Sequence, residues 1–333
     1  MTDPSSNSEP LTRPNPNRWT YFPIQHHDIH AMMKKQASCM WFPEEIDLED
    51  DVQQWKALDD DTRQYLQHVL AFFAASDGLI NQNLMQQFMQ EMQWSEVLGF
   101  YAYQACIEQV HSETYSLFID RLLTGEEKAK AFHALEHYPC IKAKADWALQ
   151  YTNDALPLAT RLAGFALVEG LFFSASFCAI FYLKCVKGIM PGLGQANEFI
   201  SRDESLHYSF AVLLYTKYVK HKMPVEDMQA MIRSAVDTEK IFVQESLPVS
   251  LIGLSAESMC EYVEHVANRI CVAFGIPKIY QNAKMPFDWM HSISLGAPKS
   301  NFFEKRETGY SKFNVGKGKK KTTPKTLTFD ADF

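Results

Sequence analysis

The sequence predicts an all-α fold. Apolar residues recur every three or four positions over long stretches, which is the helical period, and no segment alternates convincingly with the two-residue period of a strand. Glycine and proline are scarce until the last quarter of the 333 residues. Because 47% of the residues are apolar, a sizeable helical core is available.

The helical period extends over seven segments. These are residues 62–92, 95–123, 126–151, 157–186, 194–220, 225–246 and 256–274. Pro157 suits a helix start, because its fixed backbone angle matches the first turn. Gly125 and Gly188 suit helix ends, since glycine readily adopts the left-handed conformation found there. The segments together predict one bundle of helices.

The two ends of the chain differ in composition from the domain between them. Residues 1–18 are polar and rich in proline and serine, without the apolar stretch of a secretory signal, so we expect a disordered leader. Residues 301–333 are expected to form a flexible tail. Its GKGKKK run suggests nuclear import or nucleic-acid binding, but a solvated linker is the simpler interpretation. The helical domain is therefore predicted over residues 19–300.

Charge, cysteine content and hydropathy exclude several classes. The net charge of −8 argues against a nucleic-acid partner, which would need clustered Lys and Arg. Seven scattered cysteines without a CxxC pair indicate reduced thiols and a cytoplasmic protein. Residues 162–183 are apolar and long enough to span a membrane. However, Glu169 near their middle favours a buried central helix, so no membrane partner is expected.

Four predicted helices place ionisable side chains on their core-facing stripe. These residues are Asp77, Glu108, His111, Glu169, Glu204 and His207. Any one of them alone would be interpreted as an ordinary hydrogen-bonded core residue. Four buried carboxylates together are costly unless cations neutralise them, and two divalent cations carry the charge that is required. The set therefore predicts a two-metal site completed by two neutral imidazoles.

The spacing of these residues agrees with a two-metal site. Two Glu-x-x-His pairs, Glu108/His111 and Glu204/His207, each place two ligands one helical turn apart. Asp77 precedes the first pair by 31 residues, and Glu169 precedes the second by 35. This ligand order is known from di-iron and di-manganese carboxylate bundles. Oxygen and imidazole ligands suit iron or manganese, and spacing alone does not decide between them.

Tyr115 lies one turn beyond His111 on the same face of its predicted helix, and therefore near the metals. The simpler interpretation is a buried tyrosine with a hydrogen-bonded hydroxyl. The functional alternative is that a metal–oxygen oxidant removes one electron and one proton from the phenol. A lasting radical would need dry apolar surroundings, which Phe173, Phe177 and Ile200 could supply.

Six segments of the sequence carry a family resemblance: AFFAASDG, CIEQVHSETYS, ALVEGLFFSASF, MPGLGQANEFISRDESLH, NFFEKR and the terminal FDADF. In this order they resemble the small, radical-generating subunit of class I ribonucleotide reductase, in its eukaryotic and large-virus branch. The likeness extends from Trp19 to Phe333. It implies a homodimer with a ferritin-like helical bundle, additional helices and flexible termini.

The resemblance also implies roles for individual residues. The six ionisable residues named above would bind two irons, oxo-bridged when oxidised, with manganese as the alternative. Tyr115 would become the stable radical in a reaction with dioxygen. Trp41 would lie on the radical path, and Asp203 would link it to His111. Tyr310 would then pass the oxidising equivalent to the partner.

The partner implied by the resemblance is the large subunit, which reduces ribonucleotides to deoxyribonucleotides. The docking peptide would be Leu327, Thr328, Phe329, Asp330, Ala331, Asp332 and Phe333. The chain itself has neither a phosphate-binding glycine loop nor paired cysteines, so the radical would have to be exported. Three alternatives stay open: a ferritin-like iron-storage protein, a di-iron oxygenase and a structural helical protein.

Overall fold

The computed structural model describes residues 9–16, 18–151, 153–247 and 254–290. Asp77 and Leu79 are described by their backbone alone. In these parts of the chain every regular element is a helix and none is a strand, as the sequence predicts.

The main helices are α3 (Asp60–Asn83), α5 (Ser95–Leu122), α8 (Pro139–Gln150), α9 (Leu158–Leu167), α10 (Ser174–Tyr182), α11 (Pro191–Leu213), α12 (Val225–Ser246) and α13 (Ala256–Phe274). Shorter α-helices are α1 (His27–Ala37), α2 (Glu49–Trp55), α4 (Met89–Glu91), α6 (Gly125–Phe132) and α7 (Ala134–His137). Four π-helical segments interrupt or end the long helices: η4 (Leu84–Phe88), η5 (Val168–Phe172), η6 (Leu183–Lys187) and η7 (Leu214–Tyr218). Two 3-10 turns are also present: η2 (Pro10–Thr12) lies before α1, and η3 (Pro43–Glu45) lies between α1 and α2.

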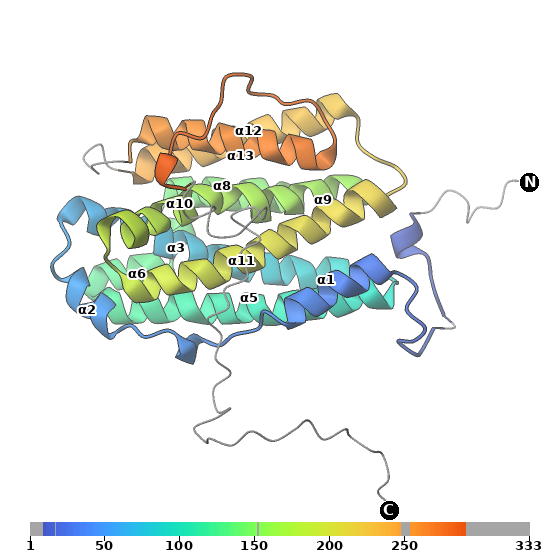
Figure 1. The fold of residues 1–333 in the computed structure, drawn as a ribbon, viewed down its shortest axis with the longest axis horizontal. Coiled ribbons are helices and arrows are strands. Elements are labelled where there is room, and N and C mark those ends of the chain that lie inside the picture. Colours follow the sequence, from blue (N-terminus) through green and yellow to red (C-terminus); the bar gives the residue numbers. More distant parts are fainter. Residues whose placement is uncertain (1–8, 17, 152, 248–253, 291–333) are drawn as a thin grey trace, which may run out of the picture.

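The helices form a layered bundle (Figure 1). Helix α3 packs along α5, and α9 packs along α11, while α1 covers α5. Helices α12 and α13 pair with each other and form an outer layer on one side of the bundle. The aromatic and aliphatic side chains between the layers are almost fully buried. The side chains of α3, α5, η5 and α11 that face one another are therefore largely shielded from water.

The long apolar segment predicted at 162–183 is the central helix of the bundle. It extends from Leu158 to Lys187 and has the length and hydropathy of a membrane span. However, 94% of its most apolar stretch of 18 residues is buried inside the protein. Neighbouring helices therefore cover its apolar surface, as a core helix requires.

One helix that was predicted to be continuous is interrupted in the structure. Residues 126–151 form three helices, α6, α7 and α8, because His133 leaves helical geometry and Tyr138 is extended before Pro139. A residue that precedes proline disfavours the α conformation, so the break at Tyr138 follows from the sequence. Gly125 begins α6 with a φ of +56° and does not end α5, whose C-cap is Leu123. Gly188 does cap its helix in the left-handed conformation, as predicted.

The N-terminal segment packs against the bundle from Glu9 onward. The side chain of Leu11 is fully buried, and its carbonyl accepts a hydrogen bond from the backbone N–H of Gln93. The guanidinium of Arg18 donates two 2.7 Å hydrogen bonds to the carboxylate of Glu96, at the start of α5. The expectation of a disordered leader through residue 18 therefore does not hold for the described residues 9–16 and 18.

Candidate metal centre

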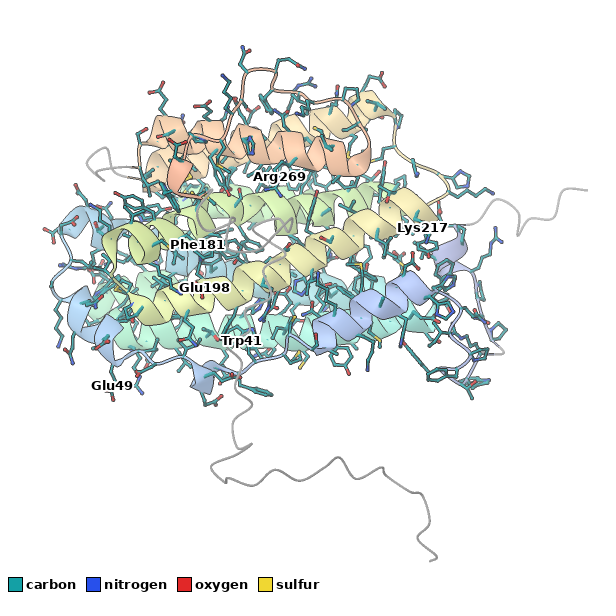
Figure 2. All side chains as sticks on the ribbon, in the orientation of Figure 1. Trp41, Glu49, Phe181, Glu198, Lys217 and Arg269 are labelled. Atoms are coloured by element: carbon teal, nitrogen blue, oxygen red, sulfur yellow. The ribbon has the colours of Figure 1, made fainter. Side chains whose placement is uncertain are left out.

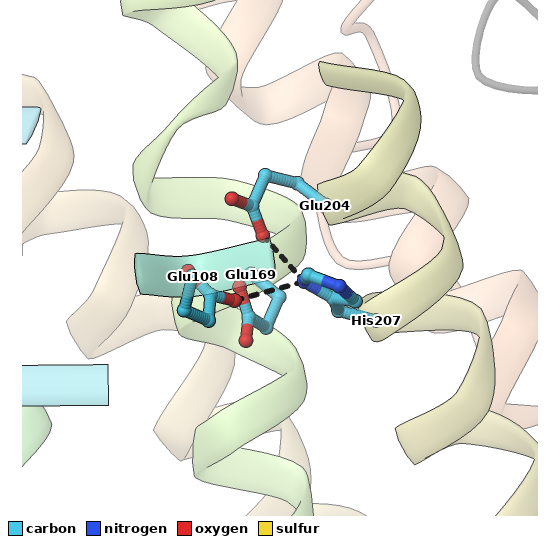
Figure 3. Close-up of side chains that lie close together, drawn as sticks. All are labelled: Glu108, Glu169, Glu204 and His207. Atoms are coloured by element: carbon cyan, nitrogen blue, oxygen red, sulfur yellow. Dashed lines mark hydrogen bonds and ion pairs between the residues drawn. The ribbon is translucent and has the colours of Figure 1, made fainter. Parts of the chain in front are cut away.

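Three elements bring the described ionisable residues together in the core. Helix α5 provides Glu108 and His111, the π-helical segment η5 provides Glu169, and α11 provides Glu204 and His207. Figure 3 shows four of these side chains converging from their helices. The sixth predicted ligand, Asp77, lies in α3, which packs on α5, but its side chain is outside the described part of the structure.

The two imidazoles share two carboxylates. Ligand atoms of Glu108, Glu169, Glu204 and His207 all lie within 4.8 Å of one another. Nδ1 of His207 lies 3.0 Å from Oε1 of Glu108 and 2.9 Å from Oε2 of Glu204. Nδ1 of His111 lies 3.5 Å from Oε2 of Glu108 and 3.0 Å from Oε1 of Glu204. Each glutamate thus points one oxygen towards each imidazole, so that the oxygens and nitrogens of the cluster converge on a common space.

Burial and charge together set the protonation of this cluster. Burial alone would lower the pKa of His207, but Glu204 and Glu108 raise it to about 9. Burial likewise opposes protonation of His111, yet Asp203, Glu108 and Glu204 hold its pKa well above the ordinary value. Burial would raise the pKa of Glu204, but the two imidazoles lower it. The carboxylates therefore attract positive charge, which protons supply when cations do not.

Several carboxylate oxygens of the cluster lack hydrogen-bond donors and are available to bind cations. Both oxygens of Glu108 and Oε1 of Glu204 are buried without a hydrogen bond to any described residue, although imidazole nitrogens lie within ion-pair distance. A buried carboxylate oxygen without a donor is costly, so this arrangement requires compensation. Coordination of two divalent ions would use these lone pairs and offset the negative charge.

Glu169 is held by a residue that the sequence analysis did not single out. Nε2 of Gln104 donates a 3.0 Å hydrogen bond to Oε1 of Glu169, and the Gln104 side chain is fully buried. Gln104 precedes Glu108 by one helical turn on α5. Gln104 is a polar residue on the core-facing stripe of its helix, and this position could have predicted that it binds another buried polar group. Glu169 itself lies within η5, and π-helical segments recur at functional sites.

A hydrogen-bonded chain leads away from His111. The indole Nε1 of Trp41 donates to Oδ2 of Asp203 at 2.8 Å, and the same oxygen lies 3.3 Å from Nε2 of His111. Arg202 was not anticipated; its guanidinium donates to the other oxygen, Oδ1, and to the carbonyl of Cys39. Figure 2 places Trp41 on the α5 side of the bundle, away from Arg269 on α13.

The predicted radical tyrosine lies in an aromatic cluster. The ring of Tyr115 is 1% exposed and stacks on Phe73, with the ring centroids 4.5 Å apart. Phe73 in turn contacts Phe177 at 5.2 Å and Phe173 at 5.6 Å. The sequence analysis named Phe173, Phe177 and Ile200, and all three are buried. It did not name Phe73, whose ring stacks directly on that of Tyr115.

Two of the predicted site components lie outside the described residues. They are Tyr310 and the docking peptide Leu327–Phe333, both in the segment 291–333.

A family profile and individual relatives of this chain point to the same family. The profile of the family described as "Ribonucleotide reductase, small chain" matches residues 18–286. A ribonucleoside-diphosphate reductase small chain from Trypanosoma brucei brucei is 47% identical over 98% of this chain and 95% of its own length. The small subunit from Dictyostelium discoideum is 48% identical, with 98% and 97% covered.

A solved structure agrees with these relatives. The structure of the Rnr4 homodimer from Saccharomyces cerevisiae superposes with a TM-score of 0.77 at 33% sequence identity. The match covers 86% of this chain and 92% of that one.

Proposed function

This chain belongs to the ribonucleotide reductase small-chain family, and we propose that its buried cluster binds two iron ions that serve to form a radical on Tyr115. The protein is the small subunit of ribonucleoside-diphosphate reductase and has the ferritin-like helical fold. A buried carboxylate and histidine cluster that fits a dinuclear metal site is present in its core.

The geometry supports specific ligand roles. Glu108 and Glu204 would hold the ions together with the two imidazoles, because each directs one oxygen towards each imidazole. His111 and His207 would bind through Nδ1, the atom that faces these glutamates. Glu169 would complete the described set, with Gln104 fixing its orientation. We propose Asp77 as the sixth ligand because its position in α3 lies on the predicted core stripe of that helix.

Iron suits a donor set of oxygen and imidazole nitrogen, with manganese as the alternative. A bound iron pair would supply the redox chemistry for activating dioxygen and oxidising a nearby phenol by one electron. The protein's part is to keep Tyr115 dry. Phe73 covers its ring face, and Phe173 and Phe177 enclose Phe73.

The hydrogen-bonded link from Trp41 through Asp203 to His111 is the observation that carries the radical proposal. An iron-storage protein or an oxygenase would use the same ligands. Neither would need a tryptophan that is connected through a carboxylate to a ligand imidazole. An oxygenase would also need space for a substrate. Phe73, Phe173 and Phe177 pack together on the Tyr115 side of the cluster and leave no such space there. A pocket of about 660 Å³ that is lined by Glu169 lies on the opposite side, between η5, α11 and α13. We infer that this link is the exit path for the oxidising equivalent.

The family implies a large-subunit partner, and the related yeast protein is a homodimer. For this chain we propose a homodimer in the cytoplasm that docks on the large subunit through Leu327–Phe333. Tyr310 would carry the oxidising equivalent between the two subunits. A tether of this kind raises the effective concentration of a weakly bound partner.

The deciding experiment is reconstitution of the apoprotein with ferrous iron and oxygen, followed by low-temperature electron paramagnetic resonance. We expect a tyrosyl signal in the wild type that is absent from Tyr115→Phe, with about two irons bound to each chain in both proteins. Two bound irons without an organic radical in the wild type would instead support an oxygenase. A properly folded wild type that takes up no metal would exclude the whole group of proposals.

A further inference from the structure

A buried ion pair contacts the end of η5, the segment that carries Glu169, and the function described above makes no use of it. Nζ of Lys144, on α8, lies 2.7 Å from Oε2 of Glu239, on α12. The two side chains are 1% and 0% exposed. Burying two charges costs several kcal/mol per ion, and an apolar pair of similar volume is often as stable or more stable. Stability alone therefore does not explain this pair.

The lysine also reaches the segment that carries Glu169. Nζ of Lys144 donates a 2.6 Å hydrogen bond to the backbone carbonyl of Phe172, the last residue of the π-helical segment η5. Glu169 lies three residues earlier, within the same turn. A hydrogen bond from a charged donor is about twice as strong as one between neutral groups. The ammonium therefore holds one end of the turn that presents Glu169 to the other ligands.

The same ammonium lies over two rings that border the aromatic cluster next to Tyr115. It lies 3.4 Å from the ring centroid of Phe72 and 4.1 Å from that of Phe242. Phe72 contacts Phe173 at 5.5 Å, and Phe173 directly follows the carbonyl that Lys144 binds. Cation–π contacts are stronger in dry surroundings than at exposed sites. Lys144 thus fixes both the backbone at Phe172 and the neighbouring aromatic ring.

Glu239 keeps the lysine charged at this position. Burial lowers the pKa of Lys144 to about 8, even though Glu239 opposes the shift. Burial raises the pKa of Glu239 to about 7 despite the lysine. Each partner therefore favours the charged form of the other, and only a charged lysine donates strongly to the Phe172 carbonyl and attracts the rings.

We propose that Lys144 and Glu239 are a positioning pair for the metal centre, which anchors η5 so that Glu169 points at the ions. This inference rests on the proposed two-metal function. A π-helical turn is a local irregularity in a helix, and it needs outside contacts to hold one geometry. Residues that orient a ligand without touching the metal typically change metal affinity by about 10–100-fold when they are removed.

The test compares metal binding with stability in three variants. Lys144→Met removes the charge, and Lys144→Met/Glu239→Leu replaces the whole pair with apolar side chains. Lys142→Met is the control, because Lys142 forms an exposed ion pair with Asp146 on the same helix. Ferrous iron uptake by each apoprotein is measured anaerobically by equilibrium dialysis. Thermal unfolding and amide hydrogen exchange at residues 168–173 are measured in parallel.

We expect Lys144→Met to bind at least one iron about 10–100-fold more weakly and to exchange faster at residues 168–173. The double variant should regain thermal stability but not iron affinity, and Lys142→Met should match the wild type. Iron affinity that recovers together with stability in the double variant would overturn the inference, because the pair would then be purely structural.

The failure of this inference is distinguishable from failure of the proposed function. A wild type that binds no iron contradicts both. A wild type that binds two irons, together with a Lys144→Met protein of equal affinity, contradicts the positioning role alone.

Discussion

Trp41 and His111 share one oxygen of a single carboxylate. Oδ2 of Asp203 accepts a 2.8 Å hydrogen bond from the indole of Trp41 and lies 3.3 Å from Nε2 of His111. Arg202 donates twice to the other oxygen, at 3.1 and 3.0 Å, and so holds the carboxylate in place. The arrangement fixes which imidazole nitrogen faces Asp203 and leaves Nδ1 to face the glutamates.

Replacing Trp41 tests the role of this link. Trp41→Phe keeps a buried aromatic ring but removes the N–H donor to Asp203. We expect ribonucleotide reduction with the large subunit to fall by about 10²–10⁴-fold, the range for losing a positioned proton-transfer partner. Iron binding should be unchanged. Trp55→Phe removes the same ring atoms from another buried tryptophan and should keep most of its activity; equal losses in the two variants would contradict the path.

Replacing Phe73 tests the surroundings of the radical. Phe73→Leu removes the ring that stacks on Tyr115 and leaves space beside the phenol. The variant should lose about 1–2 kcal/mol of stability and should form a tyrosyl radical that decays faster, because water gains access. Decay of the paramagnetic signal measures this lifetime. Phe274→Leu, which affects a ring that contacts Tyr215 on the α13 side, is the matched control. A Phe73→Leu radical as long-lived as that of the control would argue against the shielding role.

The Arg18–Glu96 pair predicts a pH dependence of stability. Burial alone would raise the pKa of Glu96, but hydrogen bonds from Arg18 and from the N–H of Gln25 lower it to about 2, from an ordinary value of 4.5. A lowered pKa contributes stability above the ordinary value that is lost as the pH falls towards the folded value. With allowance for solvent screening of the pair, Glu96→Gln should therefore cost about 1–2 kcal/mol at pH 7 and progressively less between pH 4.5 and 2. Urea unfolding of both proteins across this range measures the difference; a constant difference would contradict the assignment.

Removing the last seven residues, Leu327–Phe333, tests the docking proposal. The truncated protein should form the same tyrosyl radical as the full chain, because the metal centre lies far along the sequence in the helical core. It should not support ribonucleotide reduction with the large subunit. A synthetic peptide of these seven residues should inhibit the intact enzyme by competing for the same site. Full turnover by the truncated chain would show that docking lies elsewhere.

The sequence determined the features of this protein that depend on short separations along the chain. The all-α fold follows from the helical period, and the two Glu-x-x-His pairs follow from the spacing of one turn. Helix bounds were predicted closely for α5, α12 and α13, whose apolar stripes are long and regular. The division of 126–151 was missed, although Pro139 marked one of its breaks. Short α1 was also missed, because it buries a single row of side chains.

Only the tertiary structure decided which distant residues meet. Gln104 contacts Glu169 across 65 residues, and Trp41 contacts Asp203 across 162. Lys144 of α8 contacts the Phe172 carbonyl, at the end of η5, across 28 residues. The periodicity of the sequence does not predict such contacts. They depend on how whole helices pack and on where π-helical segments change the direction of the side chains. Helical spacing places side chains on a common face, whereas packing chooses the partner that the face meets.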